Sequence, residues 1–158
     1  WYVGCSDTNN CSLVDHPTPH RMWDLFLNPA IRIPLFGLVA RDCAQRPFWW
    51  GHGQDRHPEL WDWKDSLTAL YGGSPIVVCD SLHRLEGKRW KRFRETARRF
   101  SRLADRTLGM EMLDHRVLTQ DAALQETTFA GGTKVVANLG RTRTHDRLKP
   151  GAWRTAPG

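Results

Sequence analysis

Residues 111–139 read EMLDHRVLTQDAALQETTFAGGTKVVANL, and this stretch decides the fold of the C-terminal part of the chain. Apolar and polar side chains alternate in three segments, which are residues 111–119, 122–129 and 133–139. This alternation is typical of strands that are buried on one face. Because Gly131-Gly132 separates the last two segments and suits a tight turn, the pattern predicts an antiparallel meander with a hairpin at its end. The polar residues 141–158 are expected to form a loop or a frayed end.

The segment before the meander is the most basic part of the chain. Residues 84–106 contain ten Arg or Lys and three acidic residues, a local balance of +7 in a chain whose formal net charge is +6. Apolar side chains recur there at steps of three and four residues, at Trp90, Phe93, Ala97, Phe100 and Ala104. This spacing predicts a long helix with one apolar stripe and with basic side chains on its other faces.

Two apolar segments and another helix are expected further upstream. Residues 58–71 (PELWDWKDSLTALY) carry apolar side chains at helical spacing, with Pro58 near the start and Gly72-Gly73 as a stop. Residues 75–79 (PIVVC) are expected to form a short strand or a buried extended segment. Residues 31–40 (IRIPLFGLVA) form a nearly continuous apolar run, for which we predict a strand buried on both faces with Pro34 near its start.

The composition excludes several classes of protein. A chain of 158 residues that is 40% hydrophobic and 25% charged is of globular rather than disordered type. It contains no apolar run near the ~18 residues that cross a bilayer, so no membrane partner is expected. Four cysteines (Cys5, Cys11, Cys43 and Cys79) are too few for a disulfide scaffold and lack zinc-knuckle spacing. Their redox state, the oligomeric state and the localisation stay open, and no metal or cofactor is expected.

The first candidate binding residues follow the run at residues 31–40. Ligands of α/β folds bind beyond the carboxyl ends of the strands. Asp42 directly follows the predicted strand, where its carboxylate could accept hydrogen bonds from sugar hydroxyls or act as an acid or nucleophile. Trp49 and Trp50 are adjacent rings that could stack on a sugar or a base. Each of these residues also has a structural alternative, since such an Asp often organises a loop and Trp often belongs to the core.

A series of short motifs resembles a known family of enzymes. The motifs are Arg32-Ile-Pro-Leu-Phe-Gly-Leu-Val, Asp42-Cys43, Trp49-Trp50-Gly51, Pro58-Glu59-Leu60-Trp61, Lys64-Asp65, Leu70-Tyr71-Gly72, Met112-Leu113-Asp114-His115, Leu118-Thr119, Asp121, and Thr128-Phe129-Ala130-Gly131-Gly132-Thr133 through Asn138. In this order and spacing they resemble the C-terminal part of glycoside hydrolases related to families 101 and 129. The resemblance covers residues 31–139, and the chain departs from the family pattern at Arg41 and His52, where relatives tend to have His and Asp.

The resemblance implies a fold and a function. Family members act on α-linked N-acetylgalactosamine and similar glycans, through a (β/α)8 barrel followed by β-sandwich domains. Residues 1–108 would then be the C-terminal portion of the barrel, and residues 109–158 the start of an antiparallel sandwich. Asp42, Trp49, Trp50 and Asp55 would bind carbohydrate substrate. The catalytic carboxylates lie on earlier strands of the family's barrel, so we expect this chain to be a fragment that lacks them and has no hydrolytic activity alone.

Two functions of other classes remain open from the residues alone. The basic helix at residues 84–106 could bind nucleic acid by neutralising phosphates, although no nucleic-acid motif accompanies it and a solvated helix face is the simpler interpretation. Alternatively, Trp49 and Trp50 could form the stacking platform of a carbohydrate-binding module without catalysis. Salt-sensitive binding of oligonucleotides would separate the first of these functions from a sugar-binding one.

Overall fold

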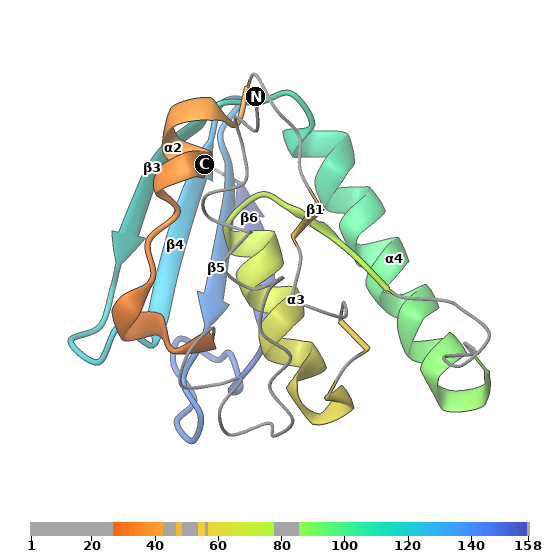
Figure 1. Cartoon of the computed structure of the whole chain (residues 1–158). Helices are drawn as coiled ribbons and strands as arrows, with labels where there is room; N and C mark the ends of the chain where they lie inside the picture. The colour runs from red at the N-terminus through yellow and green to blue at the C-terminus, as the bar shows by residue number, and fades with distance from the viewer. Residues whose placement is uncertain (1–26, 43–46, 49–53, 56, 78–85, 158) are drawn as a thin grey trace.

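A computed structural model describes residues 27–42, 47–48, 54–55, 57–77 and 86–157. In chain order its elements are the 3-10 turn η3 (Pro29–Ile31), α2 (Leu35–Ala40), β1 (Pro47–Phe48), the 3-10 turn η4 (Pro58–Leu60), α3 (Trp61–Leu70), β2 (Ser74–Pro75), α4 (Gly87–Thr107), β3 (Met112–Val117), β4 (Leu124–Phe129), β5 (Thr133–Asn138) and β6 (Trp153–Pro157). Helix α3 lies across the four-stranded sheet and α4 lies beside α3, so the fold is a mixed α+β arrangement (Figure 1).

The antiparallel meander predicted from residues 111–139 is confirmed. Strands β3, β4 and β5 pair in sequence order. Gly131 and Gly132 connect β4 to β5 with φ angles of 82° and 81°, a left-handed conformation that glycine adopts without strain. The expectation of a loop or frayed end at residues 141–158 holds for residues 141–152 but is wrong for residues 153–157, because β6 extends the sheet by pairing with β5. Trp153 anchors β6 by packing into the core, where it contacts Phe100.

The chain before the meander contains a small parallel sheet. Strands β1 and β2 pair in parallel, with Pro47 opposite Ser74 and Phe48 opposite Pro75. The predicted helix at residues 58–71 is confirmed as η4 and α3, which connect the two strands, and the long basic helix is confirmed as α4. Of the segment predicted as extended at residues 75–79, β2 includes Pro75, whereas residues 78–79 lie outside the described part of the chain.

The strand predicted at residues 31–40 is wrong. Residues 35–40 form α2, with Pro34 as its N-terminal cap residue, and α2 packs against β3. A short apolar run is compatible with either a strand or a helix, and a proline just before a helix costs no hydrogen bond. Nor is the segment buried on both faces, because four aliphatic side chains are largely exposed, namely Ile31, Ile33, Leu35 and Val39.

The buried face of α4 differs in part from the predicted apolar stripe. Phe100 is buried as expected, but Trp90 is 44% exposed and Ala97 is exposed. The side chains that α4 buries are Thr96, Phe100, Leu103 and Thr107. Both threonine hydroxyls form hydrogen bonds, which makes their burial tolerable and explains why an apolar pattern alone misplaced the face.

One hydrophobic core joins the two parts of the chain. It combines α3 residues such as Leu67 and Leu70 with Phe100 and Leu103 of α4 and with the inner face of the sheet, including Phe129. A smaller cluster of Leu124, Val136 and Leu148 covers the opposite face. The core therefore crosses the predicted division at residues 108/109. None of the described helices is long and apolar enough to span a membrane.

Replacing Gly72 with Ala is expected to lower the free energy of unfolding by about 2 to 4 kcal/mol. Gly72 ends α3 with φ at 67°, and an added Cβ would lie 2.7 Å from Nε of Arg41 and 2.9 Å from the ring of Phe129, both of which are buried. Gly109 has φ at 70° with no atom within 4 Å of an added Cβ, so G109A isolates the backbone strain and should cost about 1 kcal/mol. Urea unfolding followed by circular dichroism measures both values, and equal losses would contradict the role of the contacts with Arg41 and Phe129.

Candidate functional site

The carboxyl ends of β1 and β2 meet around Gln54. The main-chain N–H of Gln54 donates to the carbonyl of Ile76 at 2.7 Å, and its side-chain oxygen accepts from the N–H of Ile76 at 2.9 Å. The amide nitrogen of the same side chain donates to the Thr68 hydroxyl at 3.1 Å. Gln54 is fully buried, so these bonds hold the chain six residues after the end of β1 against both the end of β2 and α3.

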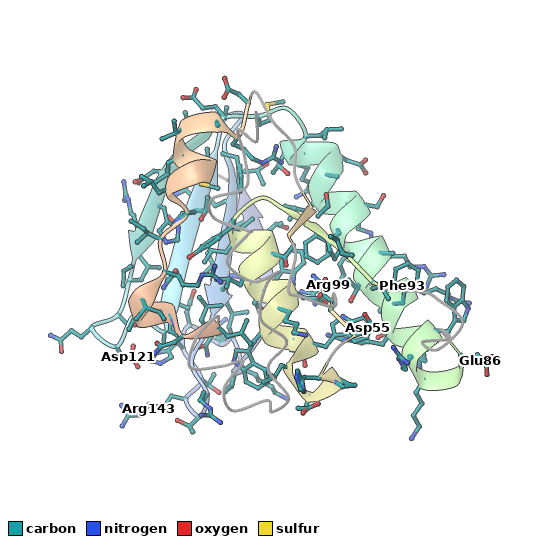
Figure 2. All side chains as sticks on the ribbon, viewed as in Figure 1. Asp55, Glu86, Phe93, Arg99, Asp121 and Arg143 are labelled. Atoms are coloured by element: carbon teal, nitrogen blue, oxygen red, sulfur yellow. The ribbon has the colours of Figure 1, made fainter. Side chains whose placement is uncertain are left out.

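Asp55 connects the same region to the start of α4. Its carboxylate is buried and forms an ion pair with Arg89, which lies in the first turn of α4 and is about one-third exposed. Figure 2 shows Asp55 between α3 and α4. Since an ionised carboxylate is rarely buried without a partner, the pair with Arg89 allows Asp55 to remain there. The geometry gives Asp55 a positioning role at this end of the parallel strands.

The other sequence-predicted site residues are only partly described. Asp42 is exposed in the turn that follows α2, and it precedes β1 in the chain. The argument that placed Asp42 at the carboxyl end of a strand was therefore wrong, because the segment before it is a helix. Trp49 and Trp50 directly follow β1 in sequence and lie outside the described residues. Of the four candidates the structure thus locates two, on different segments.

A second group of charged residues, which the sequence analysis missed, links α3 to α4. The hydroxyl of Thr96 donates to Asp65 at 2.7 Å and accepts from the indole N–H of Trp61 at 2.9 Å. Arg92 forms an ion pair with Asp62 and lies 3.6 Å from Asp65. The sequence signal for this network was the pair of acidic residues Asp62 and Asp65, which lie three positions apart in the predicted helix.

Burial raises the pKa of Asp65 to about 7. Loss of solvation of the charged form is the main cause. The hydrogen bond from Thr96 and the positive charges of Arg92 and Arg99 oppose it, whereas the charge of Asp62 adds to it. With its side chain 1% exposed, Asp65 is closed to a substrate, so it connects the two helices rather than forming a reaction site. Among the described residues there is also no cluster of His, Cys, Asp and Glu that could hold a metal ion.

Comparisons of the chain with protein-family models, with curated proteins and with solved structures find no match. The functional argument therefore depends on the residues and on their arrangement.

Asp65→Asn is expected to remove a pH dependence of stability. Between about pH 4 and pH 7 the folded state keeps the proton of Asp65 while the unfolded state has released it, so stability falls as pH rises through this window and is level above it. A shift of this size corresponds to a loss on the order of 3 kcal/mol across the window in the wild type. Urea unfolding at intervals from pH 4.5 to 7.5 measures it.

Asp105→Asn provides the matched control, because Asp105 is an exposed acidic residue on α4. This variant should keep the wild-type dependence. Parallel stability profiles of Asp65→Asn and the wild type would contradict the assignment of the pH dependence to Asp65.

Proposed function

We propose that this chain forms the last strand–helix units and the following sheet of a glycoside hydrolase acting on α-linked amino sugars, and that it contributes residues to the sugar-binding face. The observation that carries the proposal is the parallel pair β1–β2, which is joined by α3 and followed by α4. A strand, a helix, a parallel strand and a second helix are the repeating unit of an α/β barrel. This order agrees with the family resemblance of residues 31–139.

The position of the tryptophan pair in the sequence also supports a sugar-binding face at the carboxyl ends of the parallel strands. In α/β barrels the substrate binds at the carboxyl ends of the strands. Trp49 and Trp50 lie in sequence between Phe48, the last residue of β1, and Gln54, which is bonded to Ile76 just beyond β2. Indole rings at such a position suit the apolar face of a sugar ring.

Exposed aliphatic side chains on α2 and β3 support the proposal that this chain contacts another part of a larger enzyme. Strand β3 is an edge of the sheet, and α2 packs against it. More than half of the surface is exposed for Leu113 and Val117 on β3 and for Leu35 and Val39 on α2. Soluble monomers rarely leave extended apolar areas uncovered, so these side chains suit contact with further protein.

In the proposed enzyme the residues of this chain bind and orient the sugar. The rings of Trp49 and Trp50 would stack on the sugar. Asp55, held by Arg89, would position the segment between β1 and α3. The catalytic carboxylates, which are about 5 Å apart in a retaining enzyme, would lie on preceding strands.

The purified 158-residue chain is accordingly expected to show no hydrolysis of an aryl α-N-acetylgalactosaminide above the buffer blank. The proposal places the nucleophile and the general acid outside residues 1–158. Release of the aryl alcohol, followed by absorbance, is the measurement. Turnover that survives repurification and scales with protein concentration would contradict this assignment of the catalytic pair.

Sugar binding should depend on the tryptophan pair. Titration with methyl α-N-acetylgalactosaminide is expected to change the heat signal in calorimetry, with a millimolar Kd that is typical of weak single-sugar contacts. The double variant Trp49→Ala/Trp50→Ala should weaken binding about tenfold or more, because each stacking contact contributes on the order of 1 kcal/mol.

Trp90→Ala is the matched control, since Trp90 is an exposed tryptophan on α4. It should leave the affinity within about twofold of the wild type. Absence of sugar binding, or an equal loss in the control, would overturn the proposed function.

A further inference from the structure

A pocket lies between the C-terminal half of α4 and strand β6. It encloses about 380 Å³ and is lined by Arg99, Arg102, Leu103, Arg106, Trp153, Arg154 and Thr155. Four of these seven residues are arginines, and none is acidic. The three arginines of α4 follow one another at steps of three and four residues, so they project from one side of the helix. The fourth, Arg154, comes from β6 across the pocket.

Two of the arginines are held in place by their neighbours. The guanidinium of Arg99 lies over the ring of Trp153 at 4.2 Å and donates to the main-chain carbonyl of Trp153 at 3.0 Å. Arg154 donates to the carbonyl of Asp146 at 3.1 Å and forms an ion pair with the carboxylate of the same residue. Guanidinium groups fixed in this way lose little side-chain entropy when a ligand binds.

The positive charge of the pocket is only partly balanced. Asp146 pairs with Arg154, and Asp65 and Asp62 act on Arg99 while they also face Arg92. By contrast, neither Arg102 nor Arg106 has a carboxylate within 4 Å in the part of the chain that the structure describes. Arginines near the C-terminal end of a helix are favoured by its dipole, but that effect does not require them to line a common cavity. Two guanidinium charges are therefore left for a ligand.

The remaining polar groups of the pocket are also hydrogen-bond donors. Trp153 is only 7% exposed, and its indole N–H has no hydrogen-bond partner among the described residues. Thr155 adds a hydroxyl. A pocket that offers guanidinium and indole donors and almost no acceptors matches a ligand made of acceptor oxygens, and guanidinium groups bind such oxyanions in pairs of parallel hydrogen bonds.

We propose that Arg99, Arg102, Arg106, Arg154 and Trp153 form a binding site for a small phosphate or sulfate monoester. The tetrahedral end group carries nearly two negative charges in a phosphate monoester and one in a sulfate monoester, and it would balance the charges of Arg102 and Arg106 fully or in part. The volume of about 380 Å³ exceeds that of a bare oxyanion and falls in the range of small-molecule pockets, so the ester's organic part has room beside Leu103.

This site is separate from the proposed sugar-binding face. Arg89, at the carboxyl ends of the parallel strands, precedes Arg102 by thirteen helical residues, which corresponds to about 20 Å along α4. The two proposals can therefore fail independently, because variants in one region leave the side chains of the other intact.

Titration calorimetry of the full 158-residue chain at constant ionic strength tests the proposal, with phenyl phosphate, phenyl sulfate and inorganic phosphate as probes and phenol as the neutral analogue. Saturable binding of one phenyl ester with a Kd below about 1 mM, and none of phenol, is expected. The ester that binds more tightly identifies the end group. The double variant Arg102→Ala/Arg106→Ala should weaken that binding about tenfold or more, since charge-assisted hydrogen bonds are lost.

Arg94→Ala/Arg98→Ala is the matched control, because both arginines are exposed on α4 and lie outside the pocket. This double variant removes the same amount of charge as Arg102→Ala/Arg106→Ala. Circular dichroism should show wild-type helicity for both double variants, and the control should bind within about twofold of the wild type. Absence of saturable binding, or an equal loss of affinity in the control, would overturn the proposed binding site. Tight binding of a duplex oligonucleotide that depends equally on both pairs of arginines would also overturn it, in favour of an extended nucleic-acid surface.

Discussion

Burial of helix α3 is the constraint on which the rest of the structure depends. Every residue from Lys64 to Leu70 is buried, although several of them are polar. The surrounding elements therefore have to supply hydrogen-bond partners: Ser66 donates to the carbonyl of Gly151 at 2.7 Å, and Thr68 accepts from Gln54. These bonds reach segments on several sides of the helix. Because an unpaired buried polar group costs about 1 to 3 kcal/mol, they specify how the sheet, α4 and the parallel strands are placed around α3.

Helix α4 contributes the basic side chains that pair with the acidic residues on and before α3. Its N-terminal half forms ion pairs with acidic residues on or before α3, through Arg89 with Asp55 and Arg92 with Asp62. Its C-terminal half carries Arg102 and Arg106 beside β6, away from those carboxylates. One basic segment is thus used in two ways, to join the helices near the carboxyl ends of the parallel strands and to line a pocket near the other end. In Figure 2, Asp55 and Arg99 both lie between the two helices, whereas Glu86 lies at the N-terminal end of α4.

Local patterns predicted those elements in which the residues of one side stay buried along the length of the element. The strands around Gly131-Gly132 and helix α4 are examples, since period and turn chemistry agree there. Residues 31–40 were misjudged because an apolar run of that length is compatible with either structure, and contact with β3 decided in favour of α2. Strand β6 was missed because its polar sequence gives little pattern, and its pairing with β5 and the burial of Trp153 come from distant parts of the chain.

The same distinction applies to the sites. The sequence by itself determined the meander, the two long helices, the basic character of residues 84–106 and the tryptophan pair after residue 48, because each depends on residues close together in the chain. Only the tertiary structure decided that Asp55 pairs with Arg89, that Asp65 is buried against Thr96, and that Arg154 faces the arginines of α4. These contacts join residues about thirty to fifty positions apart, and local periodicity contains no information on which distant charges meet.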